Sequence, residues 1–291
     1  VRQGMELGAD DFLTKPFHAA ELLATVRTRL KKQEDHDQKT KVEVNKVTNS
    51  IMIALPHELR TPLNIILGFS DLMMMDAGNM DSDRIADMAR LINNGALRLL
   101  RVIENFLLYA QIEVVLTDRN QIDEYRKHYS IYPHLSIADN AKHQATPAGR
   151  VDDLQLELDE VDAVSLSEEL LKKIIEELVD NACKFSNEHS AIVVKGKVEG
   201  EFYVVSVSNT GRGMTPEQIA KIGAYMQFER RIYEQQGTGL GLVISKRLVE
   251  MHGGSFSIES VPDESITVQI RLPIKHDAPA LDKGSDARVV L

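Results

Sequence analysis

The stretch ALPHELRTPLN, residues 54–64, lies within an apolar repeat that is typical of one long helix. The repeat returns every three or four residues, which places its members on one helix face: Val44, Val47, Ile51, Leu55, Leu59, Leu63 and Ile66. Pro56 and Pro62 interrupt it, and a proline inside a helix costs roughly 3 kcal/mol. Because Pro56 directly precedes His57, a function of His57 is the candidate reason that two prolines are tolerated.

A second apolar repeat follows the polar segment 76–83, in which Asp81 or Ser82 can cap a helix. Its members are Ile85, Met88, Ile92, Leu99, Ile103, Phe106 and Ala110. The two repeats predict an antiparallel helical hairpin with an exposed apolar stripe. Since a second copy would bury that stripe in a four-helix bundle, we expect a homodimer.

The C-terminal half alternates strand and helix patterns. We expect strands within 153–159, 255–260 and 265–273, two strands within 191–209 about a turn at Gly200, and helices over 167–185 and 241–252. This order predicts a two-layer α/β sandwich. Residues 111–150 carry weak periodicity and are not assigned.

Composition excludes several functional classes. The net charge of −10 and the pI near 5.4 argue against a nucleic-acid or anionic-membrane partner, because both need a basic surface. Cys183 is the single cysteine, which fits a reducing compartment without disulfides. No apolar run approaches the roughly 20 residues that span a bilayer, and no signal peptide opens the chain. We therefore expect a cytoplasmic protein without membrane insertion.

Polar residues in the helix over 167–185 form a candidate site. Glu177, Asn181 and Lys184 fall at i, i+4 and i+7 and share one face, although a solvated polar face would give the same pattern. Two glycine-rich segments, SNTGRGM at 208–214 and GTGLGL at 237–242, lie further along the chain. Each alone is compatible with a plain turn, but together with the polar face they indicate a nucleotide pocket.

Five motifs of this sequence resemble those of a known protein family. In order, HELRTPLN, ELVDNACKFS, NTGRGM, YMQFERR and GTGLGL resemble the H, N, G1, F and G2 boxes of two-component sensor histidine kinases. GADDFLTKPF, residues 8–17, resembles the closing strand and helix of a response-regulator receiver, with Lys15 in the place of the receiver's lysine. The resemblance implies a multidomain α+β protein: a helical hairpin in a dimeric four-helix bundle, followed by an ATP-binding α/β sandwich of the histidine kinase, gyrase and chaperone type.

The implied domain boundaries follow the motifs. They are a receiver remnant at 1–30, a helical linker at 31–43, a dimerisation and histidine phosphotransfer domain at 44–112, a catalytic ATP-binding domain at 113–275 and a disordered tail at 276–291.

The resemblance also implies roles in the hairpin. His57 would take the γ-phosphate of ATP and pass it to an aspartate of a response-regulator receiver domain, and Glu58 would accept the proton of its imidazole. Glu177 is the second candidate for the proton acceptor. Thr61 completes HELRT, the motif of kinases that also dephosphorylate their regulator, although a hydroxyl bonded to the carbonyl four residues back is the alternative.

In the sandwich, Asn181 would hold Mg²⁺ through its amide oxygen and Lys184 would offset phosphate charge. Residues 214–236 would form a lid anchored by Phe228. The remaining nucleotide contacts would come from Asn209, Gly211, Gly213, Gly237, Gly239, Leu240 and Gly241. Asn209 departs from the family, which has an aspartate there to accept a hydrogen bond from the adenine amino group, so we expect weaker or less selective ATP binding.

Two other functions stay open at this point. One is a nucleotide-binding pseudokinase scaffold that regulates a partner without autophosphorylation, which Asn209 alone supports. The other is a different ATPase on the same sandwich, of the gyrase, chaperone or mismatch-repair kind, which needs no HELRTPLN hairpin.

Overall fold

The computed structural model describes residues 55–56, 58–76, 78, 80–220, 222 and 240–277. All of them belong to one compact unit of the chain, Ser50–Leu291. The predicted receiver remnant and linker, most of the predicted lid and residues 278–291 of the predicted tail lie outside the described residues.

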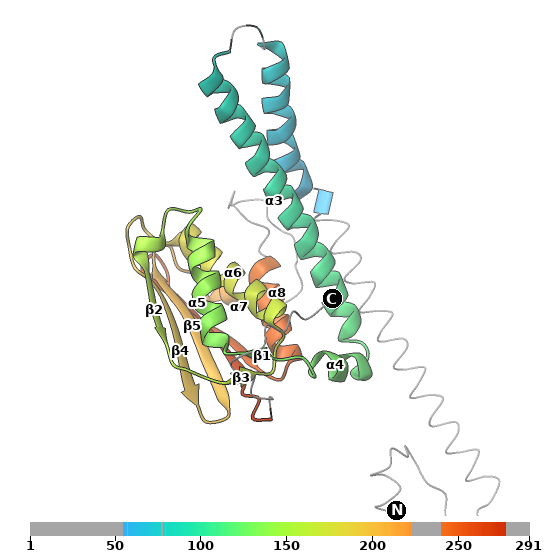
Figure 1. The fold of residues 1–291 in the computed structure, drawn as a ribbon, viewed down its shortest axis with the longest axis vertical. Helices are drawn as coiled ribbons and strands as arrows, with labels where there is room; N and C mark the ends of the chain where they lie inside the picture. The colour runs from blue at the N-terminus through green and yellow to red at the C-terminus, as the bar shows by residue number, and fades with distance from the viewer. Residues whose placement is uncertain are drawn as a thin grey trace, which may run out of the picture. The chain divides into compact units, whose positions relative to one another are not determined.

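The predicted helical hairpin is present (Figure 1). Residues 58–75 are helical, and α3 runs over Ser82–Val115. Asp81 is the residue that caps α3, because its side chain accepts a hydrogen bond from the Arg84 backbone N–H at 2.8 Å. The helices meet at Gly95, where a β-carbon would lie 3.0 Å from Ile66 Cγ1 and 3.3 Å from the Pro62 carbonyl oxygen. A glycine there lets the two backbones approach closely.

Within one chain the hairpin buries only part of its apolar stripe. Met88 and Phe106 of α3 are 8% and 4% exposed, whereas Ile85 and Ile103 of the same stripe are 41% and 40% exposed. The C-terminal part of α3 packs on the sandwich, since Phe106 and Val115 join its core. α3 therefore serves both regions.

Residues 111–150 were left unassigned; the first five continue α3, and residues 116–153 form short elements. They are α4 (Arg119–Tyr125), β1 (Ser130–Ile131), α5 (Pro133–Ala145) and the 3₁₀ turn η1 (Val151–Asp153). α5 begins with Pro133 at its first turn, where a missing N–H costs nothing, and its buried residues recur every four positions from Pro133 to Ala145. β1 pairs antiparallel with β3 (Ala163–Val164).

The main sheet has five strands in the order β2-β4-β5-β7-β6. They are β2 (Leu154–Leu158), β4 (Ile192–Glu199), β5 (Phe202–Thr210), β6 (Ser255–Val261) and β7 (Ser265–Pro273). β2 pairs parallel with β4, and the other pairs are antiparallel. Gly200 has a φ of +58° and closes the β4–β5 hairpin, as predicted.

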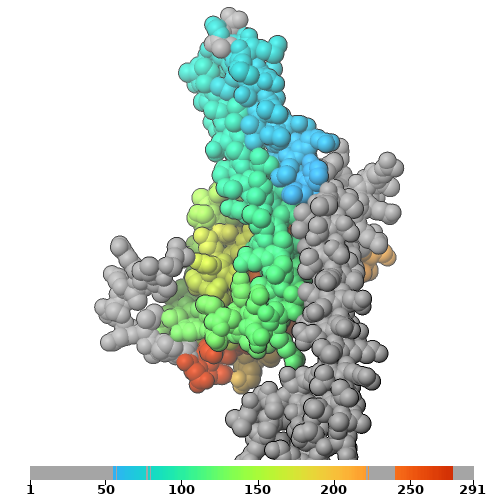
Figure 2. Space-filling view, turned by 90° about the vertical axis from the view of Figure 1, so that its right-hand side faces the viewer, coloured from blue at the N-terminus to red at the C-terminus, as the bar shows by residue number. Residues whose placement is uncertain are grey.

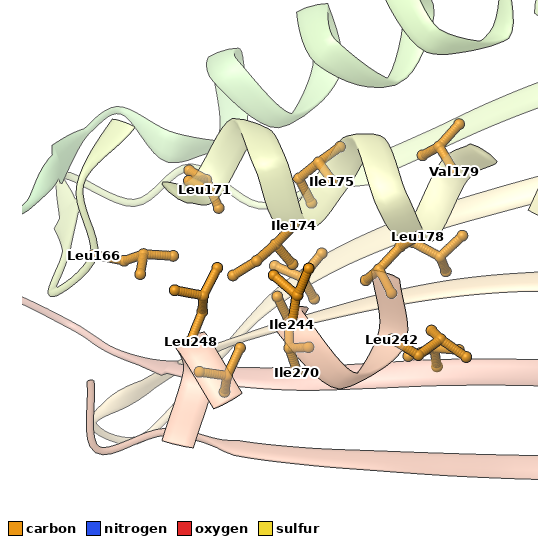
Figure 3. Packing of buried hydrophobic residues seen from close by; sticks show 14 of the residues in the cluster. Leu166, Leu171, Ile174, Ile175, Leu178, Val179, Leu242, Ile244, Leu248 and Ile270 are labelled. Carbon is orange, nitrogen blue, oxygen red and sulfur yellow. The ribbon is translucent and has the colours of Figure 1, made fainter. Parts of the chain in front are cut away.

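Helices α5, α6 (Glu168–Phe185) and α8 (Leu240–Met251) lie on one face of this sheet (Figure 1). Side chains from α6, α8 and β7 interdigitate between the layers, as Figure 3 shows for Ile174, Ile244 and Ile270, all of which are 0% exposed. The short helix α7 (Pro216–Ala220) follows β5. The predicted α+β class with a two-layer sandwich is confirmed.

Among the described residues, none of the helices combines the length and the apolar content that crossing a bilayer requires.

Candidate functional site

Helix α6 carries the first group of candidate residues. Ser167 caps it by accepting a hydrogen bond from the Leu170 backbone N–H, and Glu168 and Glu169 in its first turn complement the helix dipole. Its buried face contains the residues that the sequence predicted: Ile174, Ile175, Leu178 and Ala182. This face packs α6 on the sheet and thereby fixes the position of its polar residues relative to the sheet.

Glu177 does not lie on a solvated face. It is 6% exposed, and its Oε1 accepts hydrogen bonds from Lys173 Nζ at 2.8 Å and from Asn105 Nδ2 at 3.2 Å. Arg101 Nε lies 3.9 Å from the same oxygen. Two of these three partners come from α3, so the Glu177 carboxylate is held at the contact between α3 and α6.

Gly241 in α8 packs directly against Glu177. A β-carbon at position 241 would lie 2.1 Å from Glu177 Oε2, which no side chain can tolerate without a shift. Glycine at this position therefore lets α8 approach α6, and it brings the predicted N-box and G2-box residues together.

Asn181 and Lys184 continue α6 beyond Glu177, and Asp180 lies between them and Glu177. Asp180 accepts hydrogen bonds from Arg101 Nη1 at 2.8 Å and from Gln144 Nε2 at 3.1 Å, and it also pairs with Lys184. Lys184 therefore has an acidic partner that a phosphate would have to replace or share.

The G1 segment lies beside the C-terminal end of α6. Gly211 forms a β-bridge with Ser186, and a β-carbon at Gly211 would lie 2.1 Å from the Phe185 carbonyl oxygen. Asn209, at the end of β5, is 6% exposed, and its Nδ2 donates to the Thr210 carbonyl at 3.3 Å. Gly213 has a φ of +60° and packs against the Val261 carbonyl. These contacts join the predicted N and G1 boxes.

The residues present fit a magnesium nucleotide. The Asn181 amide is half-buried, and its oxygen is a hard ligand of the kind that Mg²⁺ prefers. The described residues contain no cluster of three His, Cys, Asp or Glu side chains that could hold a metal. Mg²⁺ bound to a nucleotide does not need such a cluster, because phosphate oxygens and waters complete its coordination around one or two protein oxygens.

Of the other predicted site residues, some are described by the structure and some lie outside the described residues. Leu240 opens α8 and is 0% exposed. Glu58 is half-buried and Thr61 exposed, both on the first helix of the hairpin. His57, Phe228, Gly237 and Gly239 lie outside the described residues.

Sequence reasoning missed Arg101 and Asn105. Both lie on α3, and Figure 2 shows α3, in green, lying over the yellow surface of α6. Asn105 is 2% exposed, and its spacing of four residues from Arg101 was the one available signal: a polar pair beside an apolar stripe. Their acidic partners lie more than 70 residues away in the chain, which no local pattern reveals.

Comparison with known proteins agrees with this geometry. Residues 54–114 match the family described as His Kinase A (phospho-acceptor) domain, and residues 166–276 match that of the histidine kinase-, DNA gyrase B- and HSP90-like ATPases. A Caulobacter vibrioides protein named the non-motile and phage-resistance protein is 30% identical over 82% of this chain. The histidine protein kinase DivJ of the same species is 33% identical over 76% of this chain.

The fold likeness extends to a solved structure. The Acinetobacter baumannii histidine kinase AdeS matches with a TM-score of 0.54 at 16% identity, over 75% of this chain and 98% of that chain, a likeness that concerns the fold alone. The chain spans about a third of the curated relatives, since the matches cover 29% of the Caulobacter protein and 36% of DivJ.

Proposed function

Because this chain belongs to the two-component sensor histidine kinases, we propose that it transfers the γ-phosphoryl group of ATP to His57 and from there to an aspartate of a response-regulator receiver domain. The observation that carries the proposal is the convergence of three separate segments of the sandwich. Gly241 lies against Glu177 and Gly211 lies against the end of α6, so the two glycine segments contact both ends of the stretch of α6 that contains Asn181 and Lys184.

The chemistry follows from the residue types. A ring nitrogen of neutral His57 attacks the γ-phosphorus, the bond to the β–γ bridging oxygen breaks, and ADP leaves. The proton on the other ring nitrogen passes to a carboxylate. Of the two candidates, Glu58 is favoured, because Glu177 Oε1 is engaged by Lys173 and Asn105. When bound, Mg²⁺ would neutralise phosphate charge, with Asn181 as its protein ligand.

The first test is incubation with γ-labelled ATP and Mg²⁺, beside the variant His57→Gln. We expect label that is acid-labile, alkali-stable and absent from the variant. An unlabelled protein that still binds ATP would instead support the pseudokinase scaffold.

We further propose phosphatase activity towards the phosphorylated regulator, in which Thr61 positions the attacking water. Thr61 is exposed on the hairpin helix, where a receiver domain can reach it. The variant Thr61→Ala should lengthen the lifetime of the phosphorylated regulator and leave autophosphorylation of His57 intact. An unchanged lifetime would remove Thr61 from this role.

The proposed assembly is a homodimer through the hairpin. Large apolar side chains on its helices are at least 40% exposed within one chain, among them Leu67, Met75, Leu97, Leu100 and Leu107. A second copy would cover them in a four-helix bundle. Sedimentation that shows only monomers at micromolar concentration would contradict this. The cytoplasmic location rests on composition and stays a prediction.

Asn209 is proposed to contact the adenine. Its amide oxygen accepts a hydrogen bond without the charge that an aspartate would add. The variant Asn209→Asp should bind ATP more tightly, as measured by calorimetry, and an unchanged affinity would contradict the proposed contact.

A further inference from the structure

Arg150 lies outside the motifs and outside both family matches, yet it has the most complete set of contacts beside the nucleotide site. A guanidinium carries five N–H donors in a rigid fork. All five are used. Nε pairs with Asp153, Nη1 donates to the Cys183 carbonyl at 3.4 Å and to Ser186 Oγ at 2.8 Å, and Nη2 donates to the carbonyls of Asn187 and Ser190 at 3.2 and 2.9 Å.

These acceptors are grouped at the C-terminal end of α6. The last carbonyls of a helix lack partners within the helix, and its negative dipole end attracts a cation. Arg150 supplies both the hydrogen-bond donors and the positive charge. Its side chain is only 12% exposed, and its ion pair with Asp153 compensates for the cost of burying that charge. It therefore fixes the last turn of α6, which contains Lys184, and the loop that follows.

The same backbone also contacts the G1 segment, which belongs to the proposed nucleotide site. Asn187 N donates to the Thr210 carbonyl at 3.0 Å, Arg212 N donates to the Phe185 carbonyl at 3.2 Å, and Ser186 bridges to Gly211. Residues 185–187 thus lie between Arg150 on one side and the G1 segment on the other. A shift of this segment would move Lys184 and Gly211 together.

We propose that Arg150 is a positioning residue for ATP: it does not touch the nucleotide, but its five-donor fork holds the α6 terminus and the G1 segment in the geometry that binds phosphate and adenine. The inference rests on the proposed function, because it concerns the same site. Lysine cannot replace arginine here, since its ammonium has three donors on a single atom and cannot reach all five acceptors.

The test compares Arg150→Gln and Arg150→Lys with Arg271→Gln as the matched control. Arg271 pairs with Glu199 at 2.9 Å. It lies near one end of β7, whereas Ile266, the residue of β7 that pairs with Asn209, lies near the other end. The dissociation constant for ATP with Mg²⁺ is measured by calorimetry at low temperature, on variants whose circular dichroism shows that they are folded. The KM for ATP and the autophosphorylation rate at saturating ATP are measured alongside.

We expect Arg150→Gln to weaken ATP binding about tenfold and to raise KM with little change in the saturated rate, while Arg150→Lys falls between it and the unsubstituted chain. Arg271→Gln should bind ATP normally. A purely structural role would lower the melting temperature without changing the dissociation constant, and that result would overturn the inference. If Arg150→Gln does not fold, the ATP affinity of Arg150→Lys becomes the test. An unchanged affinity in Arg150→Lys would overturn the inference. An unsubstituted chain that fails to bind ATP would overturn the proposed function as well.

Discussion

The helical hairpin and the sandwich are built from equally apolar patterns but use them differently. In the sandwich, side chains such as Ile174, Ile244 and Ile270 are 0% exposed within one chain. In the hairpin, Leu97 and Leu107 are apolar side chains of similar size and are 57% and 65% exposed. The sandwich therefore closes its core within one chain, with Phe106 and Val115 of α3 contributing to it, whereas the hairpin leaves large apolar side chains exposed that the proposed dimer would cover.

This difference separates stability from assembly. A large-to-small change in the sandwich removes contacts that the single chain has already made. The same change at an exposed leucine of the hairpin removes contacts that only the proposed dimer would make. The contact between the two regions, through α3, is polar where it meets α6, because Arg101 and Asn105 approach Glu177 and Asp180 there.

The largest expected effect is on the sandwich core. Ile174→Ala should lower the free energy of unfolding by about 2–5 kcal/mol, because it leaves a cavity at a fully buried position. Urea unfolding measures this, and the transition of the sandwich is recognised by its shift in the presence of ATP. The matched variant Leu97→Ala should leave that transition unchanged and weaken the dimer in sedimentation. Equal losses in both variants would contradict the comparison.

The next effect concerns close packing between α6 and α8. Gly241→Ala should destabilise the sandwich by about 1–3 kcal/mol and weaken ATP binding, because its methyl group would overlap Glu177 Oε2. Gly68→Ala on the hairpin is the control, since its new methyl group meets no atom within 4 Å and should raise helix stability by about 0.5–1 kcal/mol. Urea unfolding and calorimetry with ATP distinguish the two, and normal ATP binding by Gly241→Ala would argue against a tight α6–α8 contact.

A pH-dependent effect is expected at the junction of α4 and α8. His252 is 3% exposed, and burial is the main cause that lowers its pKa below the ordinary 6.5, with Arg126 and His128 adding to the shift. The unfolded chain then binds more protons than the folded chain below pH 6.5, so stability falls as the pH drops from that value towards the lowered pKa. Melting curves of the unsubstituted chain and of His252→Gln between about pH 7.5 and 5.5 test this, because the ordinary pKa of histidine, 6.5, which applies to the unfolded chain, lies in that range. A parallel pH dependence of the two proteins would exclude His252 as the cause.

The smallest effect is expected where the two regions meet. Arg101 Nη1 lies 2.8 Å from Asp180 Oδ2, but the Arg101 side chain is 34% exposed, so solvent screening limits the coupling to about 1 kcal/mol or less. A double-mutant cycle with Arg101→Gln and Asp180→Asn measures it by urea unfolding. The cycle sharpens the comparison, because a much larger coupling energy would mean that this contact between the hairpin and the sandwich is stronger than a solvent-screened ion pair.

Most of the elements were predictable because their patterns are local. The periods of α3, α6 and α8 and the alternation of β2 and β4–β7 stand in the sequence, and the order of the motifs identified the candidate site. Segment 116–150 was not predictable, because its elements are short and its helix α5 starts at Pro133 behind Tyr132, whose φ is +48°. The roles of His57 and Asn181 stay predictions.

By itself, the sequence determined the two regions, their order and the residue types of the site, because helix and strand periods and glycine-rich motifs are properties of neighbouring residues. Only the tertiary structure decided which groups meet. The burial of Glu177 against α3, the approach of Gly241 to its carboxylate and four of the five acceptors around Arg150 all join residues distant in the chain. Such contacts depend on the packing of whole helices against a sheet, and packing is set by shape and volume in three dimensions rather than by spacing along the chain.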